Sequence, residues 1–305
     1  MSAIKIEPLD GSLSFGCQVH GLNADNVTDA SVRQAISEAF DRHGMILFTE
    51  MDRTDELQMA VSSIFGPPQD YAFHGKVQVD PKAAQGLVEF NYEGNIVEAD
   101  GKPIVGWVPW HFDACYSPTL NRGGVLRALE IPTEGGLTGF ADGIQLYNAI
   151  SPQLRAQFEN AFILYHHTRA TFENQRFGVP AGYRWVSMSP HVKALFEAKK
   201  NEPRSLHPAI WQRDSGERVL HVSAWQATGI YQREDAEGDA LLEALCQEMY
   251  DKMEVYWHQW QPTDMVAWDN WRFVHSAAGN DPKYPRLVRR TTIAGDYGLG
   301  RLEEG

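Results

Sequence analysis

An imidazole and a carboxylate stand two residues apart at His111 and Asp113, within residues 107–116. Alternate residues of a strand share one face, so a strand here would point both side chains the same way, about 6 to 7 Å apart along the backbone. One more histidine would complete the two-histidine, one-carboxylate triad that leaves half of the octahedron open on Fe(II). Because the chain has 11 histidines, such pairs also arise by chance, and a strand-end histidine hydrogen-bonded to a neighbouring acid is the alternative.

The candidate for the third ligand is His275, and Arg286, Arg289 and Arg290 follow it in the sequence. Arg286 and Arg290 are four residues apart, so in an extended strand both guanidinium groups would share one face while Arg289 pointed away. Beside a metal, two such groups would form a receptacle for a small anion. A basic run on the surface is the alternative interpretation.

Other residues of metal-binding types are interpreted as structural. Cys115 follows Asp113 by two residues, but a facial iron site needs no thiolate. His166 and His167 are adjacent, so they would point to opposite sides of a strand. The three cysteines are odd in number and far apart, which indicates a reducing compartment and no disulfide framework.

These side chains need a large scaffold, and a chain of 305 residues with 43% hydrophobic content can bury a sizeable core as a single domain over residues 1–305. The elements predicted first are a hairpin at residues 4–20, a helix ending at Gly44, a strand at 45–48 and a helix at 54–64. We expect Thr28 or Ser31 to cap the first of these helices.

Strands outnumber helices towards the C-terminus. The predicted strands are residues 125–129, 219–223, 265–270 and 288–293, and the predicted helices are two short ones after residue 142, one near 190–199 and one at 239–253. Ser151 is expected to cap the second short helix, with Pro152 in its first turn. Residues 67–105 are predicted to form a long loop that covers the site, and residues 168–212 an irregular insert. The expected class is mainly β with peripheral helices.

Charge and hydropathy argue against two kinds of partner. A net charge of -13 without a lysine or arginine tract is unfavourable for nucleic-acid binding. No apolar run approaches the roughly 18 to 20 residues that span a bilayer, and the first residues lack the apolar centre of a signal peptide. We therefore expect a soluble, cytoplasmic protein with neither a nucleic-acid nor a membrane partner.

Taken together, the motifs resemble those of the Fe(II)/2-oxoglutarate-dependent dioxygenases of the taurine dioxygenase and 2,4-dichlorophenoxyacetate dioxygenase (TauD/TfdA) family. They span most of the chain and comprise Phe65-Gly66, His111-x-Asp113, Gly135-Gly136-Leu137-Thr138, Trp268-Asp269-Asn270, His275, and the series Arg286, Arg290, Thr291 and Thr292. The resemblance implies a double-stranded β-helix, a cupin-like jelly roll. One departure is Thr263, in the turn before the last ligand strand, where a glycine is usual.

The resemblance also implies roles for these residues. The Fe(II) ligands would be His111, Asp113 and His275, with 2-oxoglutarate and O2 as cosubstrates. Arg286 and Thr138 would hold the distal carboxylate of 2-oxoglutarate, whereas Arg290 would serve the cosubstrate, an anionic substrate or both. The expected reaction is hydroxylation of a C–H bond with release of succinate and CO2, because related halogenases lack the carboxylate that Asp113 supplies.

The expected substrate is a small organic acid with an aromatic or amino-acid-like body, its anion near Arg290. Residues that could line its pocket are Tyr71, His74, Asn91, Trp110 and Trp225; a core position is the alternative for each aromatic one. Two competing functions use the same scaffold: a cupin-like metal hydrolase or isomerase, and a non-enzymatic jelly roll that binds a small ligand. A homo-oligomer is expected by family analogy alone.

Overall fold

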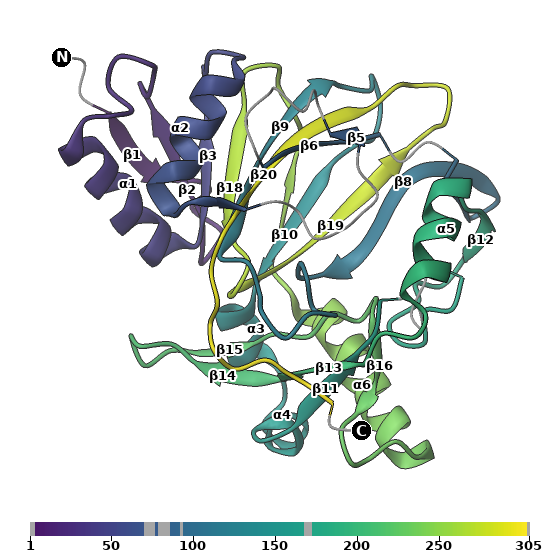
Figure 1. Cartoon of the computed structure of the whole chain (residues 1–305). Helices are drawn as coiled ribbons and strands as arrows, with labels where there is room; N and C mark the ends of the chain where they lie inside the picture. The colour runs from purple at the N-terminus through teal and green to yellow at the C-terminus, as the bar shows by residue number, and fades with distance from the viewer. Residues whose placement is uncertain (1–3, 70–76, 79–85, 92–93, 168–172, 304–305) are drawn as a thin grey trace.

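Two large sheets form the centre of the computed structural model, which describes residues 4–69, 77–78, 86–91, 94–167 and 173–303 (Figure 1). The larger sheet has nine strands, all antiparallel to their neighbours except the β2–β3 pair. Its order is β1 (Lys5–Pro8), β2 (Cys17–His20), β3 (Met45–Phe48), β18 (Met265–Asp269), β9 (Gly123–Glu130), β20 (Leu287–Ile293), β6 (Leu87–Phe90) and β5 (Val77–Gln78), with β4 (Pro68–Gln69) also on β20.

The second sheet has six strands, in the order β12 (Tyr183–Ser187), β7 (Ile96–Ala99), β8 (Lys102–His111), β19 (Phe273–Asn280), β10 (Thr138–Asp142) and β17 (Val255–His258). Smaller sheets join β16 (Ala227–Ile230), β11 (Phe162–Tyr165), β13 (Ser205–Pro208) and β21 (Arg301–Leu302), and pair β14 (Ile210–Gln212) with β15 (Arg218–Leu220). The predicted class, a mainly β jelly roll with peripheral helices, is confirmed.

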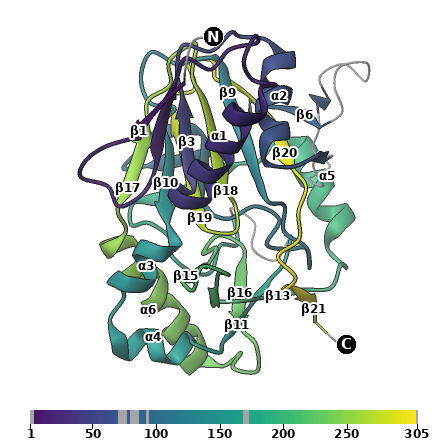
Figure 2. The same cartoon turned by 90° about the vertical axis from the view of Figure 1, so that its left-hand side faces the viewer.

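The helices lie outside the sheets. They are α1 (Ala30–His43), α2 (Asp55–Phe65), α3 (Gly143–Ala149), α4 (Pro152–Phe158), α5 (Pro190–Lys199) and α6 (Ala236–Lys252). Helices α1 and α2 flank the larger sheet, α5 lies near β8 and β12, and α3, α4 and α6 gather at the end away from the N-terminus (Figures 1 and 2). Within the described residues, none of these helices has the length and apolarity to cross a membrane.

Local chemistry explains where α1 begins and ends. The Asp29 side chain accepts hydrogen bonds from the backbone N–H groups of Ser31 and Val32, so the predicted caps Thr28 and Ser31 were wrong. Gly44 ends the helix in the left-handed region at φ 70°, as predicted. A Cβ atom there would also lie 2.4 Å from the Phe273 ring. Both the backbone conformation and the lack of space therefore favour glycine at this position.

Several predicted boundaries were wrong because strand partners lie far away in the sequence. The region 67–105 contains β4, β6, β7 and the start of β8, where a long loop was expected, since β6 pairs with β20 and β7 with β8. The strand expected at 219–223 ends at residue 220. Ser151 begins α4 without a side-chain capping bond, because its hydroxyl donates to Glu248.

A buried ion pair joins β10 and β19, two of the strands that carry residues of the site. Arg272 lies just before β19 and donates to both carboxylate oxygens of Asp142, the last residue of β10, at 2.8 and 2.7 Å. The same carboxylate accepts from the backbone N–H of Ile144 and so caps α3. Both ion-pair partners are at most 4% exposed, so the pair fixes how β10 and β19 enter the second sheet.

Candidate metal centre

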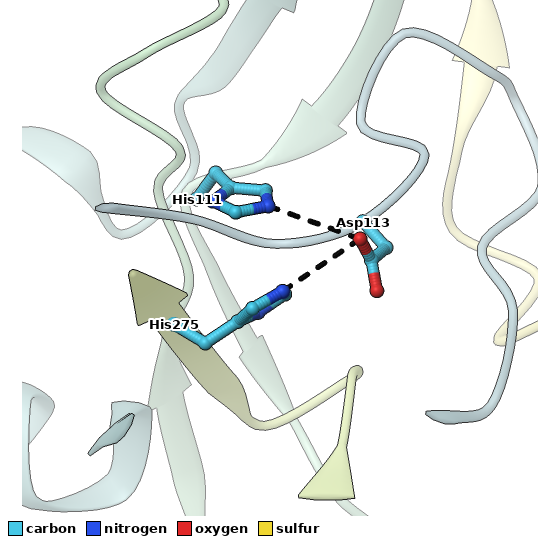
Figure 3. Close-up of side chains that lie close together, drawn as sticks. All are labelled: His111, Asp113 and His275. Atoms are coloured by element: carbon cyan, nitrogen blue, oxygen red, sulfur yellow. Dashed lines mark ion pairs between the residues drawn. The ribbon is translucent and has the colours of Figure 1, made fainter. Parts of the chain in front are cut away.

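Three potential ligand side chains converge from the ends of two paired strands. His111 is the last residue of β8 and lies opposite His275 of β19, while Asp113 follows in a turn. The Nε2 atoms of His111 and His275 lie 3.8 and 3.7 Å from the same oxygen, Asp113 Oδ1 (Figure 3). One ligand atom from each residue falls within 4.8 Å of the others. These separations are too long for hydrogen bonds, and the donor set suits a divalent transition metal.

Asp113 reaches this position differently from the prediction. A strand was expected to continue through Asp113, but β8 ends at His111 and Phe112 turns into the core, fully buried. The carboxylate therefore approaches the imidazoles from a turn rather than from the same strand face. The two groups still converge, because the turn brings Asp113 back towards the β8–β19 pair.

The histidines have the protonation that a metal requires. The Nδ1 atom of His111 lies 2.7 Å from the carbonyl oxygen of Pro109, so an N–H at Nδ1 donates to it and the lone pair is at Nε2. Burial lowers the pKa of His111, and it lowers the pKa of His275 well below its usual value. Both rings are therefore neutral near neutral pH, the state in which imidazole binds metals.

Asp113 stays ionised although it is only 2% exposed. Burial by itself raises the pKa of a carboxyl group, but the guanidinium of Arg290, together with the rings of His275 and His111, outweighs this and holds the pKa of Asp113 well below its usual range. Arg290 Nη2 lies 2.5 Å from Asp113 Oδ2, the oxygen that does not face the histidines. The two carboxylate oxygens thus have separate partners, and Oδ1 is directed to the candidate metal position.

The backbone of Asp113 is held by a residue for which sequence reasoning proposed no role. The Asn270 side chain accepts from the Asp113 N–H at 2.7 Å and donates to the Asp113 carbonyl at 3.1 Å. The same amide donates to Asn121, and Asn270 is fully buried. Asn270 belonged to one of the motifs, but its partner is 157 residues away, so no local signal could reveal the contact.

Arg286 and Thr138 lie together in the cavity beside the candidate metal ligands. The cavity opens between the two large sheets, since Leu126 of β9 and Val108 of β8 both line it. Arg286 Nε donates to the carbonyl of Gly136 at 3.2 Å, and its Nη2 donates to Thr138 Oγ1 at 3.4 Å. A fixed guanidinium beside a hydroxyl is a suitable site for a carboxylate.

The residues proposed for a substrate pocket are distributed unevenly. Trp225 lines the cavity and packs edge-on against the His111 ring, 5.2 Å between centroids, and Arg290 also lines it. Trp110 faces a neighbouring hollow and packs against Trp257, as expected for the residue beside His111 on a strand. Asn91 is exposed and is not part of the cavity wall. Tyr71 and His74 lie outside the described residues.

Much of the wall of the cavity beside the candidate metal ligands was not predicted from the sequence. The missed cavity residues include Phe90, Asn95, Tyr116, Val192, Phe196 and Gln226. Val192 and Phe196 lie four residues apart on α5, a helical spacing that could have indicated a shared face, although not what that face covers. Cys115, interpreted as structural, is fully buried and donates to Gln226, and burial raises the pKa of its thiol. His166 Nε2 is hydrogen-bonded to the carbonyl of Glu202.

Comparisons with known proteins find relatives over almost the whole chain. The model of the family "Taurine catabolism dioxygenase TauD, TfdA family" matches residues 5–292. An (S)-phenoxypropionate/alpha-ketoglutarate-dioxygenase from Sphingobium herbicidovorans is 28% identical over 301 residues, covering 96% of each chain. Pentalenolactone F synthase from Streptomyces avermitilis is 25% identical, over 96% of this chain and 95% of the relative. The crystal structure of AAD-2 with Mn(II) and N-oxalylglycine matches with a TM-score of 0.72 at 22% identity, over 98% of this chain and all of the other.

Removing the Asn270 amide should weaken metal binding. Asn270→Ala would leave the Asp113 peptide without its partners, and loss of such supporting contacts typically reduces metal affinity about 10- to 100-fold. Anaerobic calorimetric titration with Mn(II) measures the metal affinity. Asn148→Ala is the matched control, because Asn148 is also an amide but lies exposed on α3, bonded to the carbonyl of Ile144. Equal Mn(II) affinities in the folded wild type and Asn270→Ala would contradict the role given to Asn270.

Proposed function

The chain belongs to the taurine catabolism dioxygenase TauD, TfdA family, and from that membership we propose that it hydroxylates a small organic acid at a ferrous centre held by His111, Asp113 and His275. Enzymes of this family are Fe(II)- and 2-oxoglutarate-dependent oxidoreductases, so the chain is a dioxygenase, not a hydrolase, an isomerase or a non-enzymatic jelly roll. The observation that carries the proposed centre is the convergence of the two Nε2 atoms on Asp113 Oδ1.

The three side chains would act as one metal-binding face. Each imidazole offers a neutral nitrogen, and Asp113 offers one charged oxygen while Arg290 holds the other. Three protein ligands leave room for a chelating keto acid and for O2. Fe(II) bound there would activate O2, which is the oxidant: one oxygen atom would enter succinate as 2-oxoglutarate loses CO2, and the other would enter the hydroxylated substrate. The protein provides the geometry, the neutralising charge and a partly enclosed cavity.

Arg286 and Thr138 would hold the distal carboxylate of 2-oxoglutarate. Arg286 is 8% exposed and Thr138 4% exposed, so little water reaches either side chain. A charge-assisted hydrogen bond from this pair to a carboxylate would therefore form in a surrounding of low dielectric constant, where such bonds are strong. The guanidinium is itself fixed through the Gly136 carbonyl. A fork fixed in this way suits a carboxylate better than a lysine would.

Arg290 would place the acidic group of the substrate. It lines the same cavity, packs over the Trp268 ring at 5.0 Å, and carries the Asp113 ion pair on Nη2. A substrate anion would share this guanidinium with Asp113, so the proposed anion lies close to the metal ligands. The position favours oxidation of a carbon near the acidic group.

The cavity wall supports an aromatic or otherwise bulky apolar substrate body. Its apolar members include Phe90, Val108, Leu126, Val192, Phe196 and Trp225. Apolar walls with a few fixed polar groups are typical of small-molecule sites. The relative from Sphingobium herbicidovorans is named for phenoxypropionate, an aromatic acid, whereas other relatives are named for pentalenolactone and sulfate esters. A cytoplasmic location and homo-oligomer formation stay predictions.

The proposed reaction can be tested by measuring whether O2 uptake and succinate formation depend on the substrate. An accepted acid should stimulate O2 uptake and succinate formation only when Fe(II) and 2-oxoglutarate are present. Asp113→Ala should reduce both to the metal-free level, because it removes the only charged ligand of the proposed centre. Asp239→Ala, which removes a partly exposed carboxylate paired with Arg176, is the control and should keep full activity. Near-normal succinate formation by Asp113→Ala would contradict the proposed ligand set.

The acidic group of the substrate can be tested separately. A charge-assisted hydrogen bond contributes about 1.5 to 3 kcal/mol, so kcat/KM for the best acid should exceed that for its methyl ester about 10- to 100-fold. Succinate release at limiting substrate concentration measures both values. Equal values for acid and ester would remove the anion from the proposal and leave the ferrous centre in place.

A further inference from the structure

The Thr138 hydroxyl receives hydrogen bonds from two groups that can only donate. Trp260 Nε1 lies 3.0 Å from Thr138 Oγ1, and Arg286 Nη2 lies 3.4 Å from the same atom. An indole N–H and a guanidinium have no acceptor atom. Both lone pairs of the hydroxyl oxygen are therefore engaged, and neither neighbour can take the hydroxyl hydrogen in return.

The hydroxyl hydrogen must then point to a third partner. Among the residues that the structure describes, none accepts a hydrogen bond from Thr138. Thr138 and Arg286 both line the cavity, whereas Trp260 is 4% exposed and stands behind the wall. The remaining direction leads into the cavity, where a carboxylate oxygen would be the acceptor.

We infer that Trp260 is a positioning residue for cosubstrate binding: its N–H turns the Thr138 hydroxyl into a fixed donor for the distal carboxylate of 2-oxoglutarate. This inference rests on the proposed role of Thr138 and Arg286. Without the indole N–H, the Thr138 hydroxyl could rotate, and its orientation would have to be restricted again each time the carboxylate bound. Trp260 would thus improve affinity without touching the ligand.

The surroundings of Trp260 hold its indole in place. The His258 ring packs edge-on against it, 4.5 Å between centroids at 87°. His258 Nδ1 lies 3.0 Å from the Tyr256 hydroxyl, and its Nε2 lies 3.3 Å from Asp264 Oδ2. His258 also lies directly opposite Thr138 in the β10–β17 pair. The indole is therefore tied to the same strand pair that carries its acceptor.

The turn after Trp260 explains why Thr263 can stand where a glycine is usual in the family. The Asp264 carboxylate accepts from the Gln261 N–H at 3.0 Å, and the Thr263 carbonyl accepts from the Met51 N–H at 2.9 Å. Thr263 is exposed and does not have a positive φ. The turn therefore does not need glycine at this position, and it can still fix Trp260 beside Thr138.

Binding of two keto acids can distinguish a role of Trp260 in orienting the Thr138 hydroxyl from a role in packing alone. Both 2-oxoglutarate and 2-oxobutanoate can chelate a metal through the keto acid group, but 2-oxobutanoate lacks the distal carboxylate. In calorimetric titrations of the Mn(II)-loaded protein, Trp260→Phe should raise the Kd for 2-oxoglutarate about threefold to tenfold, the equivalent of one hydrogen bond. The Kd for 2-oxobutanoate should not change. Trp211→Phe is the matched control, since its indole donates to the Trp271 carbonyl away from the cavity.

A double-variant cycle completes the test. In a Thr138→Val background, Trp260→Phe should cause no further loss of 2-oxoglutarate affinity, because the hydroxyl it orients is gone. Equal weakening of both keto acids, or additive effects of the two substitutions, would overturn the positioning role. If Thr138→Val alone left 2-oxoglutarate affinity unchanged, the proposed cosubstrate site would fail first. Should Trp260→Phe not fold, 3-benzothienylalanine at position 260 keeps the ring shape without the N–H and must give the same result.

Discussion

The Asp113 carboxylate must stay ionised inside the protein, and much of the site follows from that requirement. A buried charge is tolerated when opposite charge and hydrogen bonds replace the lost water. Arg290 supplies the charge at Oδ2, and Asn270 holds the peptide at both its N–H and its carbonyl. The other oxygen, Oδ1, is left to face the two imidazoles. The contacts that stabilise the buried Asp113 carboxylate therefore also direct Oδ1 and the two imidazoles towards one position, where a cation could bind.

Strand β20 and the residue before it distribute three arginines between two sides of the larger sheet. Arg286 and Arg290 both line the cavity, one bonded to Thr138 and the other to Asp113. Arg289 points away and bonds to Glu89 and Asp55. Four residues of extended chain span about 13 Å, so one strand face can serve two separate anions. This spacing is why a cosubstrate and an acidic substrate can be proposed for the same cavity.

Local signals predicted a good part of this structure. The left-handed end of α1 at Gly44, the alternation of the arginines on β20 and the mainly β class all follow from short-range stereochemistry. One failure was local, since Asp29 caps α1 in place of Thr28 or Ser31; the others depend on distant partners. The β6–β20 pairing replaces an expected loop, and the pairing of β8 with β19 ends at His111, so Asp113 lies in a turn. The Asn270 and Trp260 contacts join segments more than 100 residues apart, and no periodicity in the sequence encodes them.

The most direct test of the proposed centre is optical and needs no knowledge of the substrate. Fe(II) and 2-oxoglutarate are added to the protein without oxygen, and the visible spectrum is searched for the weak charge-transfer band of a keto acid chelated to ferrous iron. We expect the band to appear with the wild type and to disappear in His275→Ala. Iron binding without the band, or a band that His275→Ala leaves intact, would contradict the proposed centre.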